Sequence, residues 1–118
     1  MKKYIVRRGE DGVSLSKISV TERGSESVRH ILPKRSQAII NHSPNGFEFG
    51  SAGSGPSQLA LAILLDALTG KSPSPELAAQ ERYHDFKFAF IVGAKGDEFE
   101  IAEKEILEWF ATTPGMIQ

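Results

Sequence analysis

The segment that decides the fold runs from Asn41 to Gly70 and reads NHSPNGFEFGSAGSGPSQLALAILLDALTG. Turn-forming residues come first, and the alternation of aromatic and acidic residues at 47–49 then indicates a short strand. A glycine-rich loop follows. Pro56 suits the first position of a helix, and glycine is typical of the position after its last turn, so a helix is predicted over 56–69. Apolar residues lie on nearly every side of this helix, which is expected to occupy the centre of the core.

The rest of the chain predicts a small sheet and two further helices around that central helix. Alternating or apolar runs predict strands at 3–8, 13–20, 28–32, 86–92 and 99–101, and helical spacing predicts helices at 75–84 and 103–112. Polar residues at 33–37 predict a loop. Phe86, Phe88 and Phe90 share one face of the strand expected there and are assigned to the core. This order of elements predicts an α+β fold, in which a small, mainly antiparallel sheet packs against the central apolar helix and the C-terminal helix.

Length and composition predict one compact domain over residues 1–118, with a tail at 113–118. The chain is 40% hydrophobic and 25% charged and contains no cysteine, so disulfides, thiolate metal sites and cysteine nucleophiles are excluded. The longest apolar run, at 59–65, is far shorter than the roughly 20 residues of a membrane span. No signal-peptide pattern follows the basic start, and a cytoplasmic protein is expected.

Charge is unevenly divided along the chain. Residues 1–36 hold nine lysines and arginines against four acids, whereas residues 37–118 hold five against eleven, for a net charge of −1. Such a division can mark a basic surface that faces a partner, and the alternative is a set of solvated charges on strand faces. A domain-level basic excess is missing, so the sequence carries no strong nucleic-acid signature.

The glycine-rich loop is the first candidate for a binding site. Glycines allow the backbone to approach a ligand, serine hydroxyls offer hydrogen bonds, and the start of the following helix carries about half a positive charge. These features predict an anion site formed by Gly50, Ser51, Gly53, Ser54, Gly55 and Ser57. The phosphate-loop pattern with its lysine is absent, as is the dinucleotide pattern Gly-x-Gly-x-x-Gly. The alternative is a packing loop, in which small residues let the central helix approach the sheet.

Four other residues are candidates for the same site. His42 precedes the loop and either contacts a ligand or caps its own turn. Arg7 and Arg8 belong to the basic part of the chain, and with Phe47 or Phe49 they are expected to form an anion pocket with a stacking platform. The alternative is that they are solvated charges on strand faces. The histidine spacings of metal sites and the Gly-x-Ser-x-Gly elbow are absent from the sequence. No metal ligand, catalytic residue or cofactor is therefore assigned.

A longer motif covers residues 41–110. Its members are His42, Ser43, Pro44, Gly46 to Gly50, Gly53 to Pro56, Gln58 to Ala62, Phe86, Lys87 and Trp109. Over this region the chain resembles a small uncharacterised family of bacteria and their phages, known as domain of unknown function 6166. It departs from the family pattern at Phe49, where tryptophan is common, and at Ser51-Ala52, where tyrosine and glycine are common. The resemblance implies kinship and a phage or mobile-element origin, but no particular chemistry, because the family has no established activity.

Together, these patterns predict a small non-enzymatic binding protein that sequesters an anionic, nucleotide-type ligand of host defence at the glycine-rich loop. Two alternatives stay open: a protein–protein interaction module that inhibits or adapts a host protein, and a small enzyme acting on a phosphorylated substrate. A homo-oligomer is also expected, because one domain of this size has little room for a deep pocket. Gly55 is predicted to lie at the N-cap of the central helix and to have either a glycine-only backbone conformation or a close contact with another element.

Overall fold

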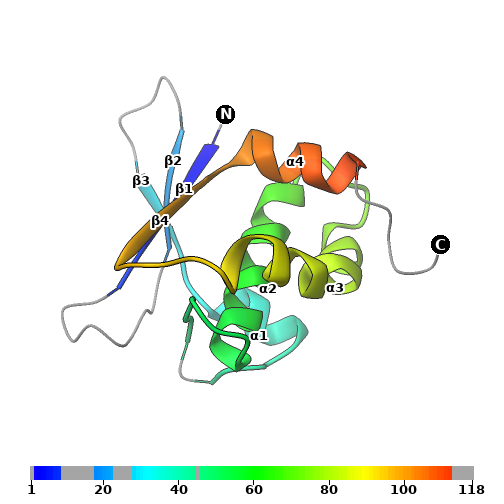
Figure 1. Ribbon diagram of the computed structural model, residues 1–118. Coiled ribbons are helices and arrows are strands. Elements are labelled where there is room, and N and C mark those ends of the chain that lie inside the picture. The colour runs from blue at the N-terminus through cyan, green and yellow to red at the C-terminus, as the bar shows by residue number, and fades with distance from the viewer. Residues whose placement is uncertain (1, 9–17, 23–27, 45, 113–118) are drawn as a thin grey trace.

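The computed structural model describes residues 2–8, 18–22, 28–44 and 46–112, and it shows a four-stranded sheet with helices against one face (Figure 1). Along the chain the elements are β1 (Lys2–Arg7), β2 (Ile18–Glu22), β3 (Val28–Ile31), α1 (Lys34–Ile39), α2 (Ser54–Leu68), α3 (Pro75–Phe86), η1 (Lys87–Ile91), β4 (Glu98–Ala102) and α4 (Glu103–Thr112). The α+β class predicted from the sequence is therefore confirmed.

The sheet is antiparallel and has the strand order β3-β2-β1-β4. Tyr4 of β1 lies opposite Val20 of β2 on one side and Ile101 of β4 on the other, and all three side chains are buried. Because side chains alternate between the faces of a strand, these residues belong to the face that forms one wall of the core. The connection from β3 to β4 contains α1, α2, α3 and η1, so the helices are inserted between an edge strand and the last strand.

The helix α2 occupies the centre of the core, as its composition predicts. Every residue from 56 to 68 is buried, and α2 packs against α1, α3, α4 and η1. A helix without a polar face has to be covered on all sides, and these neighbours provide the cover. The polar side chains that α2 buries, Ser57, Gln58 and Asp66, are all hydrogen-bonded.

The segment 86–92 is helical, which corrects the prediction of a strand. α3 continues directly into η1, a π-helical turn in which the N–H of Val92 donates to the carbonyl of Lys87 at 3.0 Å. Periodicity does not separate strand from helix in a short apolar run, and no proline or glycine divides this run from α3. Phe86 is buried but Phe88 is 54% exposed, so the three phenylalanines do not share one core face.

Two shorter predictions also change. The loop predicted at 33–37 forms most of α1, where the buried hydroxyl of Ser36 donates to the carbonyl of Pro33 and accepts from the side chain of Gln58. A helix this short depends on such tertiary contacts, which local propensity does not report. The strand predicted at 47–49 is reduced to an isolated bridge at Phe47.

The other elements follow the prediction where the structure describes them. The predicted strands at 3–8, 28–32 and 99–101 correspond to β1, β3 and β4, and the helices at 75–84 and 103–112 correspond to α3 and α4. Turn-forming residues at 9–12 and 23–25 also predict two turns between the strands. These segments, the first part of the strand predicted at 13–20 and the tail at 113–118 lie outside the described residues. Across the described part of the chain, no helix combines the length and apolarity needed to cross a bilayer.

Candidate anion site at the glycine loop

The helix α2 begins earlier than the sequence predicts, which changes the position of Gly55. Gly53 is the N-cap and Ser54 is the first helical residue, so Gly55 lies inside the first turn, and its prediction as the N-cap is wrong. The predicted close contact is confirmed, because a Cβ at this position would lie 2.5 Å from the Cβ and 3.1 Å from the backbone nitrogen of Glu48. Glycine at 55 therefore lets the start of α2 approach the chain that precedes the loop.

The two other loop glycines differ from each other. Gly50 has a φ of 84°, its N–H donates to the carbonyl of Ile91 at 3.1 Å, and a Cβ there would lie 3.1 Å from the carbonyl oxygen of Ala94. Gly50 thus anchors the loop to the end of η1. A Cβ on Gly53 would have no neighbour closer than 3.9 Å. Packing requires glycine at 50 and 55, and it leaves position 53 open.

A buried cation, Lys87, reaches this loop from η1. Its Nζ donates to the Oγ of Ser57 at 3.0 Å and to the carbonyl of Ala52 at 3.3 Å, and the residue is only 5% exposed. Within the described ranges, no carboxylate forms an ion pair with this ammonium group. The loop sequence lacks the lysine of a phosphate loop, but the fold supplies one from a different element.

Positive charge therefore accumulates where α2 starts. The N-terminus of a helix carries about half a positive charge, and the first N–H groups have no acceptor within the helix. Lys87 adds a full charge to this end of α2. Burial lowers the pKa of His42, and the charge of Lys87 lowers it further, so the nearby imidazole is held neutral at neutral pH. An anion bound here would relieve the repulsion between these positive groups.

The turn before the loop is held by Gln58, which is fully buried in α2. Its Oε1 accepts from the backbone N–H groups of His42 and Ser43 at 2.8 and 3.0 Å, and its Nε2 donates to the hydroxyl of Ser36 at 2.9 Å. The Nε2 of His42 is buried and has no hydrogen-bond partner among the described residues. Gln58 thus provides the hydrogen bonds that hold the turn, and the buried imidazole nitrogen of His42 keeps an unused hydrogen-bonding position.

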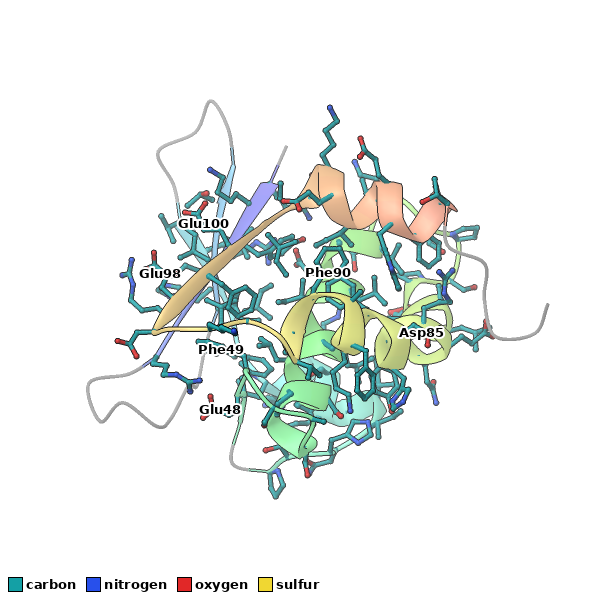
Figure 2. All side chains as sticks on the ribbon, in the orientation of Figure 1. Glu48, Phe49, Asp85, Phe90, Glu98 and Glu100 are labelled. Carbon is teal, nitrogen blue, oxygen red and sulfur yellow. The ribbon has the colours of Figure 1, made fainter. Side chains whose placement is uncertain are left out.

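Arg8 and Phe49 contact each other, as predicted, but contacts within the protein already occupy both side chains. The guanidinium lies 4.0 Å from the ring centroid of Phe49, donates to its carbonyl at 3.1 Å and pairs with the carboxylate of Glu48. Phe49 is 2% exposed and offers no open face for stacking. Arg7 pairs instead with Glu98 of β4 at 2.6 Å, and Figure 2 shows that acid on the edge strand, apart from Glu48 near the loop. Both arginines thus already have acidic partners.

Two residues of the site, Lys87 and Gln58, are not among those that the sequence singles out for binding. Both belong to the longer motif, and a lysine inside the apolar run 86–92 is itself a signal, because charged residues are rarely buried without a reason. The interpretation of that run as a strand hides the signal, since the lysine would then lie on an exposed strand face. Of the predicted serines, Ser57 meets Lys87, whereas Ser51 and Ser54 are exposed on the loop.

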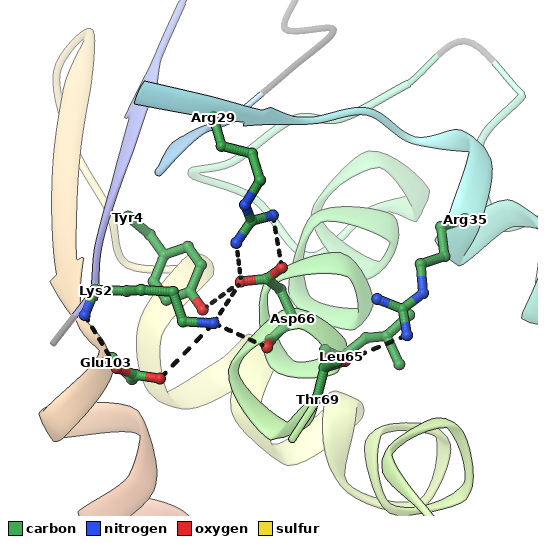
Figure 3. Close-up of polar contacts among 8 residues, drawn as sticks. All are labelled: Lys2, Tyr4, Arg29, Arg35, Leu65, Asp66, Thr69 and Glu103. Atoms are coloured by element: carbon green, nitrogen blue, oxygen red, sulfur yellow. Dashed lines mark hydrogen bonds and ion pairs between the residues drawn. The ribbon is translucent and has the colours of Figure 1, made fainter. Parts of the chain in front are cut away.

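A second polar cluster surrounds Asp66, further along α2 (Figure 3). Its carboxylate accepts from the hydroxyl of Tyr4 at 2.7 Å, from the guanidinium of Arg29 at 2.8 and 3.1 Å, and from Nζ of Lys2 at 3.3 Å. Lys2 also lies 3.8 Å from the carboxylate of Glu103 at the start of α4. The cluster therefore joins β1, β3 and α4 to the central helix.

The surroundings of Asp66 favour its ionised form. Burial by itself would raise the pKa of Asp66, but the hydrogen bonds from Arg29 and Tyr4 and the charge of Lys2 outweigh it, and the pKa lies below its usual value. Burial raises the pKa of Tyr4, and the hydrogen bond to Asp66 raises it further, so the phenol stays protonated as a donor. Arg29 and Lys2 therefore neutralise the charge of Asp66 within the protein itself.

The fold and the site together define a small α+β domain with a buried cation at the positive start of its central helix. Within the described residues, no group of three or more histidine, aspartate or glutamate side chains is placed to hold a metal ion. The chain belongs to the Family of unknown function (DUF6166), whose profile matches residues 7–112, and this confirms the relationship that the motif indicates. No curated protein and no solved structure matches the chain.

Proposed function

We propose that this protein binds an anionic, nucleotide-type ligand whose phosphate lies at the start of α2 beside Lys87. The observation that carries the proposal is the burial of this lysine, 5% exposed, with no carboxylate partner among the described residues. A buried charge without an opposite charge costs free energy, and a bound phosphate would lower that cost. Ser57 and Ala52 orient the ammonium group, while the exposed hydroxyls of Ser51 and Ser54 can donate to phosphate oxygens.

An exposed aromatic ring beside Lys87 supports a nucleotide over a bare phosphate. Phe88 is 54% exposed, and its ring centroid lies 4.9 Å from the Nζ of Lys87 and 5.2 Å from the ring centroid of His84. Stacking of a base on an aromatic side chain contributes about 1–3 kcal/mol and tolerates any base. Phe88 thus takes the role of stacking platform that the sequence assigns to Phe49.

Sequestration is the biological role that we propose for the site. The hydroxyl of Ser57 donates to the carbonyl of Gly53 at 3.2 Å and accepts from Lys87, an arrangement that holds the loop and presents no general base to the serine. The protein would hold a nucleotide signal of host defence without converting it, as a phage or mobile-element protein could.

Calorimetric titration of the full chain tests the phosphate part of the proposal. AMP and a cyclic dinucleotide are expected to bind, and adenosine, which lacks the phosphate, to bind at least tenfold more weakly. Lys87→Met should abolish binding, whereas Lys71→Met, which removes an exposed lysine, should leave it unchanged. No heat with either nucleotide at about 100 μM protein, where weak sites register, would sink the proposal. So would unchanged binding by the Lys87 variant.

A second pair of variants tests the base. Phe88 and Leu77 are exposed to similar extents, 54% and 56%, so Leu77→Ala is the matched control for Phe88→Ala. Phe88→Ala is expected to weaken AMP about tenfold while leaving pyrophosphate unchanged, which corresponds to about 1.4 kcal/mol of stacking. Chromatography of the recovered ligand separates sequestration from turnover, and a product would favour the enzyme alternative. Host protein captured equally by the parent and by the Lys87 variant would favour the interaction module.

A further inference from the structure

A cavity of about 550 Å³ lies between β3, α1 and α2, further along α2 than the glycine loop. Ala62 and Leu65 form its buried floor, and Ile31 and Leu32 line it from the end of β3. Lys34 and Arg35 line it from α1 and are exposed, so they stand at its opening. Pockets for small organic ligands commonly measure about 300–1,000 Å³, are mostly apolar and carry a few polar groups that orient the ligand.

More positive than negative side chains line this cavity. Its one acid is Asp66, whose charge is already balanced by Arg29 and its other partners. Arg35 lies 3.6 Å from Glu76, but both side chains are more than half exposed, at 52% and 56%, and such a pair contributes little. Lys34 has no ion pair within the described ranges. An anion at the opening would meet cations whose charge no strong partner satisfies.

The apolar part of the cavity determines what kind of group can accompany an anion bound at the opening. Leu32 is 58% exposed beside the cavity, one of four large hydrophobic side chains exposed in the described part of the chain. Ala62 and Leu65 contribute only aliphatic carbon to the floor, and the two buried polar residues of the lining, Ser36 and Asp66, already make hydrogen bonds within the protein. A sugar or nucleobase on this floor would find few free partners for its polar groups, whereas an acyl chain or apolar ring needs none.

We propose that this cavity binds a free amphiphilic organic anion. Its apolar chain or ring packs on Leu32 and Leu65, and its carboxylate or phosphate group lies between Lys34 and Arg35 at the opening. Figure 3 shows two arginines beside this cavity, Arg29 reaching Asp66 of α2 from β3 and Arg35 reaching Thr69, just after α2, from α1. This site shares no residue with the nucleotide site at Lys87 and does not depend on it.

Octanoate is a suitable probe, and 1-octanol is the neutral compound of equal chain length. Methyl chemical shifts of Ile31, Leu32 and Leu65 in the full chain report binding at the cavity itself. Octanoate is expected to shift all three, and 1-octanol to bind at least fivefold more weakly. Equal binding of the two compounds, or no shift of these methyl groups with octanoate, would overturn the proposal. Binding to phosphatidylglycerol vesicles without a response to octanoate would overturn the free ligand in favour of a membrane headgroup.

Two variants with matched controls locate the site. Ala38 lines the cavity from the exposed face of α1, so Ala38→Trp should block octanoate, whereas Ala111→Trp on the exposed face of α4 should not. Lys34→Glu places an acid at the opening and should weaken octanoate about fivefold, with Lys71→Glu as control. Because Lys34 is exposed, Lys34→Glu should leave the fold intact, and it therefore tests octanoate binding even if Ala38→Trp lowers the melting temperature. Undiminished octanoate binding in Lys34→Glu would overturn the head-group assignment.

Discussion

Two buried charges lie at α2, Asp66 within the helix and Lys87 packed against its start from η1, and they differ in what balances them. Asp66 accepts hydrogen bonds from Tyr4, Arg29 and Lys2, so the protein itself supplies the opposite charge. Lys87, near the start of the same helix, has a hydroxyl and a carbonyl as partners but no carboxylate among the described residues. The partners of Asp66 neutralise its charge inside the protein, whereas we propose that an external anion balances the charge of Lys87. Burial of a charged residue therefore points to a ligand only after its partners are known.

The largest expected effect comes from removing the balanced acid. Asp66→Ala leaves three donors without their acceptor, and breaking a buried ion pair costs about 3–5 kcal/mol. The lower end is expected, because the side chain of Arg29 is 51% exposed. Urea unfolding at pH 7 measures the change, with Glu81→Ala on the exposed part of α3 as control. Equal stability of the two variants would show that the network contributes nothing and would remove the contrast with Lys87.

The same acid also predicts a dependence on pH. The pKa of Asp66 lies below its usual value in the fold, so the unfolded chain binds the proton more readily. Its stabilising contribution is present above an unfolded pKa of about 3.9 and is lost as the pH falls through the folded value. Unfolding free energies measured from pH 5 downwards should therefore fall less steeply in Asp66→Asn than in the parent chain. Parallel curves would mean that other carboxylates carry the acid sensitivity.

The next effect concerns the close contact that positions the start of α2. A Cβ on Gly55 meets the backbone of Glu48, so Gly55→Ala is expected to destabilise the fold by about 2–3 kcal/mol through overpacking. Gly53→Ala meets no close neighbour and should cost under about 1 kcal/mol, the difference between glycine and alanine at an N-cap. Thermal melts of the two variants give the comparison. Similar melting temperatures would show that the loop relaxes around position 55.

Neutralising Lys87 should change the free energy of unfolding much less than Asp66→Ala does, because it removes a buried charge that has no opposite charge beside it in the described part of the chain. Lys87→Met removes an unbalanced buried charge together with two hydrogen bonds, and the net change is expected within about 1 kcal/mol of zero. Burial still lowers the pKa of His42 in this variant, but that pKa should rise part of the way toward its usual value, because the charge of Lys87 no longer lowers it further. Urea unfolding and NMR titration measure the two quantities. A loss of more than about 2 kcal/mol in the free energy of unfolding would mean that Lys87, like Asp66, stabilises the fold through its partners within the protein.

The smallest effect is the contribution of His42 to the pH dependence of stability. Its pKa is lowered in the fold, so its contribution is present above the unfolded value of about 6.5 and is lost as the pH falls through the folded value. The melting temperature should therefore decline less between pH 7 and pH 5 in His42→Gln than in the parent. Bound AMP should raise the pKa of His42 by placing an anion nearby. A His42 titration unaffected by saturating AMP would place the phosphate elsewhere.

Local signals account for the part of the fold that the sequence predicts. The helix at 56–69 is predicted because continuous apolar composition and the flanking Pro56 and Gly70 act within the segment itself. The strands β1 and β4 follow from alternation over a few residues. The start of α2 is misplaced because Ser54 and Gly55 are poor helix formers by propensity, so no local signal marks Ser54 as the first helical residue. The π-helical turn is missed because an apolar run of this length fits both periods.

The sequence by itself determined that one apolar helix forms the core and that a glycine-rich loop precedes it. Only the tertiary structure decided which charges meet. Lys87 reaches Ser57, Arg8 is matched by Glu48, and Asp66 gathers its donors from β1 and β3. These partners lie tens of residues apart along the chain, so no local pattern records them. The free energy of a buried charge depends on its neighbours in space, and folding alone brings those neighbours together.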